Sequence, residues 1–154
     1  MREVEHMIKQ IVKEEMYDRP YGVAYTGAML EDVSAIRKLH EATIAESEKH
    51  GLSLEGWSVP SDYHMTICLG ELPLHMKMRG DLNKDVELHI THFGFSDKAA
   101  AFQVTGYMSK NDMQHITVAF AERPADSKQI AQWHALDVPF VVTAMIREVP
   151  NAKP

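Results

Sequence analysis

The chain of 154 residues carries a formal net charge of −6, has a hydrophobic fraction of 45% and contains one cysteine. This length and composition suit one domain with a buried core. No dense run of lysine or arginine occurs, which argues against long nucleic acid as the partner, because such binding depends on clustered cations that release counterions. The single cysteine, Cys68, excludes an intramolecular disulfide and is typical of a reducing compartment, so we expect a cytoplasmic protein.

Residues 2 to 17 are expected to form an amphipathic helix, which either covers the domain's own core or binds a partner. The apolar residues of its inner face are Val4, Met7, Ile8, Ile11, Val12 and Met16. Charged residues throughout this segment argue against a signal peptide or a membrane span. Residues 21 to 29 have strand character, and residues 31 to 50 predict a second helix that ends at Gly51.

Residues 63 to 70 are expected to form a strand with one apolar and one chemically active face. Its apolar residues, Met65, Ile67 and Leu69, alternate with His64, Thr66 and Cys68. Residues 71 to 85 predict a loop with one helical turn, and residues 86 to 95 and 99 to 107 predict two strands joined by a turn. Residues 115 to 120 predict a strand with the same two-faced alternation.

The last part of the chain predicts a helix over residues 126 to 136 and a strand over residues 138 to 149. Pro124 suits a first helical turn, and Ile130 and Trp133 have helical spacing, which indicates a structural role for Trp133. This order of elements predicts an α+β fold with a mostly antiparallel sheet.

One short pattern, histidine, apolar residue, threonine, occurs three times in the chain, beginning at His64, His89 and His115. With nine histidines and seven threonines, only about 0.4 tripeptides with histidine first and threonine third are expected by chance, whatever the middle residue. On a strand the first and third residues point the same way, so each motif delivers an imidazole and a hydroxyl to one surface. Two motifs on neighbouring strands would therefore form a phosphate-sized site.

Such a site suits phosphodiester cleavage. The reaction needs a base to activate a nucleophile and an acid to protonate the departing oxygen, and histidine serves as either near neutral pH. Threonine hydroxyls can hydrogen-bond the non-bridging phosphate oxygens, where charge builds in the transition state. This chemistry requires no metal ion.

The motifs at His64 and His115 resemble those of the two-histidine (2H) phosphoesterase superfamily, which carries two His-x-Thr/Ser motifs on strands. The similar element order runs from about residue 21 to residue 149 and leaves the N-terminal helix outside. The resemblance implies one domain over residues 1 to 154, with a helical extension (1 to 18), a first lobe (20 to 85) and a second lobe region (86 to 150). The lobes would be pseudo-symmetric, with mostly antiparallel sheets around a central cleft, flanked by helices.

By this resemblance His64 and His115 form the acid and base pair, Thr66 and Thr117 bind phosphate, and neither a metal nor another cofactor takes part. Family members cleave 2′,3′-cyclic phosphates, 2′-5′ oligoadenylates or cyclic oligonucleotide signals, and some compact viral members counter host defence in this way. We therefore expect a phosphodiesterase for a small nucleotide, acting in the host cytoplasm if the chain is viral. A module that sequesters the nucleotide without cutting it is the alternative.

The third motif, at His89 and Thr91, competes for the catalytic role. Alternation does not reject it, because Glu87, His89 and Thr91 share one strand face. The resemblance favours the other pair, because 51 residues (115 − 64) leave room for the intervening strands better than 25 (89 − 64) do. A shift of the apolar phase across Thr91 and His92 indicates a bulge there.

Three aromatic residues, Tyr21, Tyr25 and Trp57, are candidates for stacking on a nucleobase, although each could also belong to the core or a lid. Residues 51 to 62, 71 to 85 and 108 to 113 are expected to be loops that set substrate specificity. A thiol nucleophile at Cys68 is disfavoured because no motif surrounds it. A zinc site is disfavoured because His89 and His92 would point to opposite faces of a strand.

Overall fold

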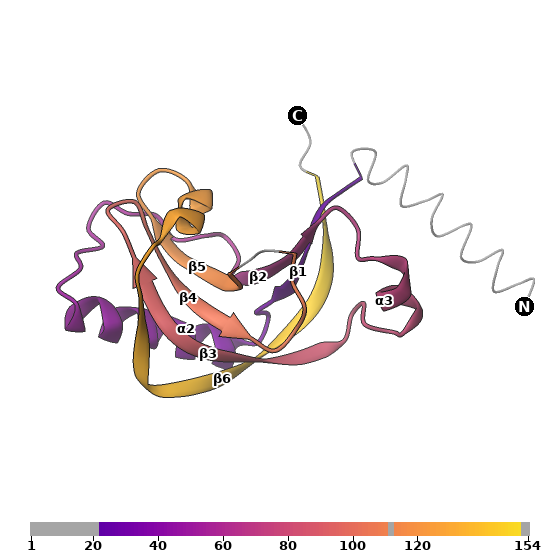
Figure 1. The fold of residues 1–154 in the computed structure, drawn as a ribbon, viewed down its shortest axis with the longest axis horizontal. Coiled ribbons are helices and arrows are strands. Elements are labelled where there is room, and N and C mark those ends of the chain that lie inside the picture. The colour runs from indigo at the N-terminus through magenta and orange to yellow at the C-terminus, as the bar shows by residue number, and fades with distance from the viewer. Residues whose placement is uncertain (1–21, 111–112, 152–154) are drawn as a thin grey trace, which may run out of the picture.

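The computed structural model describes residues 22 to 110 and 113 to 151. The predicted N-terminal helix and Tyr21 lie outside the described residues. Six strands dominate the structure (Figure 1): β1 (Val23–Met29), β2 (His64–Leu69), β3 (Asp85–Phe95), β4 (Ala99–Thr105), β5 (His115–Phe120) and β6 (Trp133–Pro150). The helical segments are α2 (Val33–Lys49), α3 (Leu74–Met78) and a 3₁₀ helix, η1 (Pro124–Gln129).

The strands close into one barrel in the order β1-β2-β5-β4-β3-β6, and every neighbouring pair is antiparallel. The α+β class and the antiparallel sheet expected from the sequence are therefore confirmed. The long β6 pairs with β3 over one part of its length and with β1 over the other, and its curved course is visible in Figure 1. In contrast, β2 and β5 share a single register pair, so the barrel closes through a short contact at this seam.

The apolar faces of the strands fill the barrel and form its core. The fully buried large side chains include Met65 and Ile116 from the two seam strands, and Leu88, Phe93 and Phe102 from β3 and β4. This follows from the alternation of apolar and polar residues, which places every second side chain inside. The alternation expected in β2 fails at its end, where Cys68 is buried and Leu69 is 82% exposed. A register shift against β1, between Thr26 and Gly27, changes the phase at this point.

Helix α2 begins at Val33, two residues after the predicted start, because Asp32 caps it. The Asp32 side chain accepts a hydrogen bond from the backbone N–H of Ser34 and so satisfies one of the free donors of the first turn. One face of the helix is buried, at Ala35, Leu39, Thr43 and Ser47. In the described part of the chain, no helix combines the length and apolarity that crossing a membrane requires.

The helix predicted over residues 126 to 136 is wrong. Residues Pro124–Gln129 form η1, the backbone turns extended at Ile130, and β6 begins at Trp133 rather than at residue 138. Ile130 and Trp133 bury apolar surface as expected, but they do so by packing on Ala99 and Ala101 of β4. Two apolar residues three apart suit this arrangement as well as a helix, and pairing of β6 with β3 decides between them.

The bulge expected near Thr91 is present. The register of β3 shifts between Ile90 and His92 against both β4 and β6. The Thr91 hydroxyl donates a hydrogen bond to the Gln103 carbonyl and lies 2.9 Å from Nδ1 of His92. The polar side chains of this segment are therefore bound to the local backbone and to each other.

Candidate phosphodiester-binding site at the β2–β5 seam

The register of the seam brings the first and last His-x-Thr motifs together. Met65 pairs with Ile116, the central residues of the two motifs. Because the strands are antiparallel, this register places His64 across from Thr117 and Thr66 across from His115. The two central residues point into the core, so the four motif side chains share the other face of the sheet. The two histidines are therefore diagonal neighbours, and such residues lie about 7–8 Å apart, somewhat less between their Cβ atoms.

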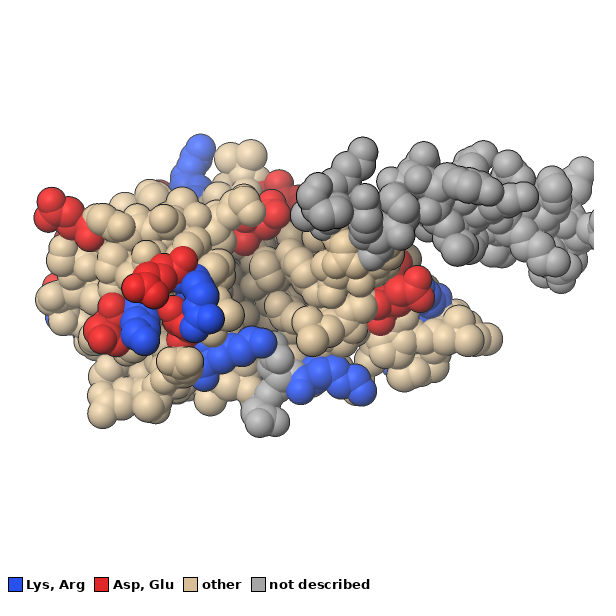
Figure 2. All heavy atoms as spheres, turned by 90° about the horizontal axis from the view of Figure 1, so that it is seen from above, with Lys and Arg blue, Asp and Glu red and all other residues tan. Residues whose placement is uncertain are grey.

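These four side chains line a pocket of about 370 Å³, which we call the motif pocket. The loop before β2, the end of β5 and η1 complete its wall. The remaining lining residues are Tyr25, Pro60, Ser61, Asp62, Phe120, Pro124, Ala125, Ser127 and Lys128. Figure 2 looks onto the side where the orange η1 lies in Figure 1; the middle of this face is hollowed, and Lys and Arg side chains gather along one border of the hollow.

His64 is held by an aromatic ring. The Tyr25 and His64 ring centroids lie 4.8 Å apart, with a 28° angle between the ring planes. Burial lowers the pKa of His64 below its usual value, and a positive charge on His115 would lower it further, while the backbone and charge of Asp62 act in the opposite direction. Nδ1 of His64 is buried and has no partner of full hydrogen-bond geometry among the described residues. The interaction of His64 with the Asp62 backbone is therefore weak, and the Tyr25 stack is its clearest positional restraint.

The position of Tyr25 depends on a glycine in the same strand. A Cβ built on Gly27 would lie 3.3 Å from the Tyr25 ring and 3.3 Å from the Met29 sulfur. Gly27 pairs with Thr66 of the first motif. Because Gly27 has no side chain, the Tyr25 ring can extend across this position and stack on His64. Tyr25, which the sequence offers as a candidate for stacking on a nucleobase, lines the motif pocket and packs on the His64 imidazole.

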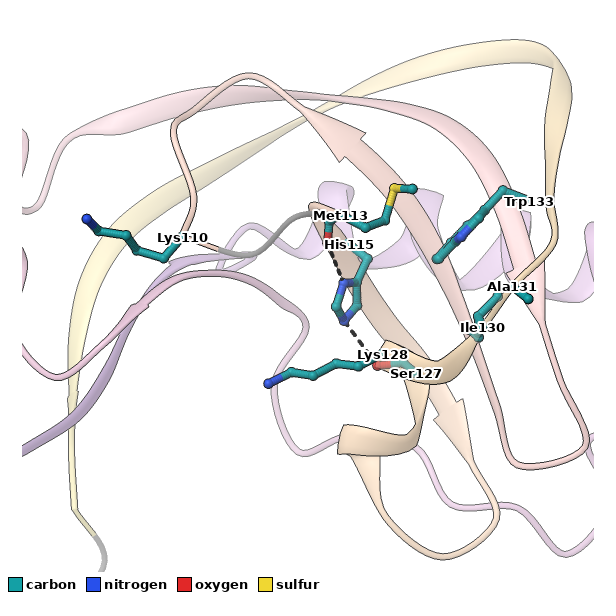
Figure 3. A pocket seen from close by; sticks show the side chains of 8 residues that line it. All are labelled: Lys110, Met113, His115, Ser127, Lys128, Ile130, Ala131 and Trp133. Carbon is teal, nitrogen blue, oxygen red and sulfur yellow. Dashed lines mark hydrogen bonds between the residues drawn. The ribbon is translucent and has the colours of Figure 1, made fainter.

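His115 is held by hydrogen bonds at both ring nitrogens. Its Nδ1 lies 2.9 Å from the Met113 carbonyl oxygen, and its Nε2 lies 3.1 Å from the Ser127 hydroxyl (Figure 3). Because a carbonyl oxygen only accepts, Nδ1 carries a proton. Burial lowers the pKa of His115, and the charge of Lys128 acts in the same direction, against the raising effect of the Met113 carbonyl. Both motif histidines therefore favour the neutral form in the free protein.

Ser127 is a residue of the candidate site that sequence reasoning missed. Its hydroxyl is buried on η1 and has three partners: His115, the Thr117 hydroxyl at 2.7 Å and the Pro124 carbonyl at 2.9 Å. When His115 is neutral, Ser127 donates its proton to Nε2; when His115 is charged, Nε2–H donates to Ser127, whose proton turns to Pro124. One hydroxyl thus accommodates both protonation states of the ring and also holds the motif threonine.

The remaining sequence-based candidates lie elsewhere. His89 is exposed on β3 and pairs with Thr105 of β4, so the third motif does not line the motif pocket. Trp57 packs against the main hydrophobic core and is absent from the pocket lining. The Cys68 thiol is buried and lies 3.4 Å from the Glu71 carbonyl oxygen. Trp133, assigned a structural role on a helix, lies instead on β6 and lines a second pocket beside His115.

Within residues 22 to 110 and 113 to 151, no three His, Cys, Asp or Glu side chains are grouped as a metal site would require. The polar side-chain groups of the motif pocket are two imidazoles, five hydroxyls, one carboxyl and one ammonium group, which can bind an oxyanion and transfer protons. Comparison of the sequence with protein-family models gave no match. Comparison with curated proteins likewise found no match.

Proposed function

We propose that this protein is a metal-independent phosphodiesterase that cleaves a small nucleotide. One observation carries the proposal: two His-x-Thr motifs lie antiparallel at one seam, with Met65 opposite Ile116, and all four of their functional side chains line one pocket. Both threonines and both histidines are in place, so an acid, a base and two phosphate-binding hydroxyls surround the same space. This is also the arrangement that the resemblance to the 2H phosphoesterases implies.

In the proposed reaction one neutral imidazole removes a proton from the attacking hydroxyl or water as the new P–O bond forms. The other imidazole, in its protonated form, gives a proton to the oxygen whose bond to phosphorus breaks. The lowered pKa values of His64 and His115 favour the neutral imidazole that acts as the base. The anionic phosphate supplies the acid, because a nearby negative charge favours the protonated form of an imidazole. After cleavage the two rings have exchanged protonation states, and exchange with water restores them.

The surroundings support binding of a negatively charged group. The Lys128 ammonium lines the motif pocket and makes no ion pair among the described residues. Thr66 and Thr117 can donate hydrogen bonds to the non-bridging oxygens. We further propose that the halves of the barrel that carry β2 and β5 correspond to the two pseudo-symmetric lobes around a cleft, and that the protein acts in the cytoplasm against a nucleotide-based antiviral signal.

A turnover screen tests the proposal. Wild type, His64→Ala, His115→Ala and His89→Ala are incubated with 2′,3′-cyclic nucleotides, 2′-5′ oligoadenylate and cyclic di- and trinucleotides, with and without EDTA, and the products are separated by chromatography. We expect wild type and His89→Ala to cleave one substrate class equally in EDTA, and the other two variants to be inactive while folded. His89 is the matched control, because it heads the same motif but lies outside the pocket.

Three results would contradict the proposal. Loss of activity in EDTA would indicate metal catalysis, and full activity of His115→Ala would remove the histidine pair from the chemistry. Tight binding of a nucleotide that is recovered intact after long incubation would indicate a protein that sequesters the signal instead.

A further inference from the structure

A second pocket of about 420 Å³ adjoins the motif pocket, and we call it the Trp133 pocket. The two pockets share His115, Ser127 and Lys128, so they lie on either side of one proposed acid–base residue. The other residues that line it are Lys110, Met113, Ile130, Ala131 and Trp133. Its volume lies within the range of about 300–1,000 Å³ that is usual for small-molecule sites.

The Trp133 pocket has one apolar end and one cationic end. Figure 3 shows Trp133, Ile130 and Ala131 on one side of the His115 ring and the Lys128 ammonium group on the other; Lys110 lies farther out on the Lys128 side, with its ammonium group directed away from the ring. Among the described residues its lining contains no carboxylate, and neither lysine makes an ion pair with them. A nucleotide has the complementary form, with a flat apolar base at one end and an anionic phosphate at the other.

The indole of Trp133 is fixed in place as a platform. It lies over Gly94, its partner on β3, and a Cβ at that position would come within 2.5 Å of its Cε3 atom. Ile130 packs beside it, since its Cγ2 atom would be 2.8 Å from the same Cβ. The ring is nevertheless only partly buried and lines the pocket. An aromatic ring supported from below and open toward a pocket is suited to stacking on a nucleobase.

We infer that the Trp133 pocket is a second nucleotide subsite, which holds the nucleoside on the far side of the scissile phosphate with its base on Trp133. This inference rests on the proposed function and narrows its substrate class. The phosphate lies at the seam between His64 and His115, one nucleoside occupies the motif pocket, and the next extends past His115 toward the indole. The substrate is then a dinucleotide or a cyclic oligonucleotide, and a mononucleoside 2′,3′-cyclic phosphate fills only half of the site.

Binding can be measured without turnover, through the fluorescence of Trp133. The chain has two tryptophans, and Trp57 packs on the core outside both pockets, so Trp57→Phe leaves Trp133 as the only reporter. In a Trp57→Phe, His64→Ala protein, we expect 2′-5′-linked diadenosine monophosphate or cyclic di-AMP to quench the emission, and adenosine 2′,3′-cyclic phosphate to leave it unchanged. Lys128→Met should weaken the binding that causes this quenching. Equal quenching by the mononucleotide, or none by either two-base ligand, would overturn the inference.

Turnover gives an independent test. Trp133→Ala should lower kcat/KM for a two-base substrate by roughly 5- to 150-fold, the range that loss of one base–aromatic stack gives, and leave that for a 2′,3′-cyclic mononucleotide unchanged. Trp133→Phe keeps a smaller ring over Gly94 and should retain most of the activity, which guards against misfolding of the alanine variant. An equal loss on both substrates would make Trp133 a purely structural residue. Quenching without cleavage by wild type would retain the subsite and reject the phosphodiesterase.

Discussion

Replacing Gly94 by alanine tests how tightly the barrel holds Trp133. The added Cβ would lie 2.5 Å and 2.8 Å from two indole atoms and 2.8 Å from Cγ2 of Ile130. Ordinary contact between carbon atoms requires about 3.5–4.0 Å, so the ring must shift by about 1 Å. Overpacking of this kind costs about 1–3 kcal/mol, offset by about 0.4–1 kcal/mol from the lower entropy of the unfolded chain. We expect Gly94→Ala to reduce the free energy of unfolding by about 1–2 kcal/mol.

A double-mutant cycle measured by urea denaturation separates this clash from other effects of the substitution. In a Trp133→Ala background the indole is absent, so Gly94→Ala should cost at least about 1 kcal/mol less than in wild type. The Ile130 contact remains in both backgrounds and sets the residual cost. In thermal unfolding, the single variant should melt about 2–8 °C below wild type. Equal costs of Gly94→Ala in the two backgrounds would refute the packing of Trp133 on this glycine.

Three other predictions concern the site and a buried ionic cluster. Ser127→Ala removes a hydroxyl with three hydrogen-bond partners and should lower the free energy of unfolding, measured by urea denaturation, by about 1–3 kcal/mol. Ser47→Ala is the control and should lower it little, because the buried Ser47 hydroxyl has no partner in the described chain. Equal losses in the two variants would contradict the Ser127 network. Burial lowers the pKa of His64 and of His115, so the unfolded chain binds more protons than the folded protein below pH about 6.5, and the free energy of unfolding should decline as the pH falls toward the lowered pKa values. A His64→Ala, His115→Ala variant should lose this decline. An unchanged slope of stability against pH in that variant would exclude the two histidines as its source. Hydrogen bonds from Arg79 and Tyr107 lower the pKa of Asp81 to about 2. The ionised Asp81 should therefore stabilise the fold fully above its ordinary pKa, and this stabilisation should disappear as the pH falls toward 2. In a pH series of unfolding curves, Asp81→Asn should remove this loss of stability in acid.

The two motif strands could be predicted from the sequence because their signal is local. His64 and His115 alternate with apolar residues, and a strand with one buried face requires this alternation at both places. That the strands would be direct neighbours, with Met65 opposite Ile116, was not contained in either segment. The resemblance to a known family supplied the reason to pair these motifs, and in the structure His89 lies outside the motif pocket.

The Ser127 contact and the strand at Trp133 could not be predicted, because both depend on contacts between distant segments of the chain. Ser127 reaches His115 because η1 packs against β5, and a serine in a short polar stretch gives no sign of that contact. The helix assigned around Trp133 was wrong because two apolar residues three apart fit either a helix or a strand that packs on β4. What decided between them was pairing with β3, where Gly94 leaves space for the indole.

The seam has an approximate twofold axis that passes between Met65 and Ile116, and rotation about it exchanges the two motifs. In the proposed reaction a symmetric substrate could therefore enter in either of two orientations, and a site left with exchanged protons after one turnover would be ready for a molecule entering the opposite way. The neighbours of the two rings differ, however, because a phenol ring packs on His64 and a serine hydroxyl binds His115. In the proposed enzyme these neighbours would set the orientation in which the substrate binds. That orientation would then be reversed by exchanging the phenol ring and the hydroxyl between the two histidines, with both motifs left unchanged.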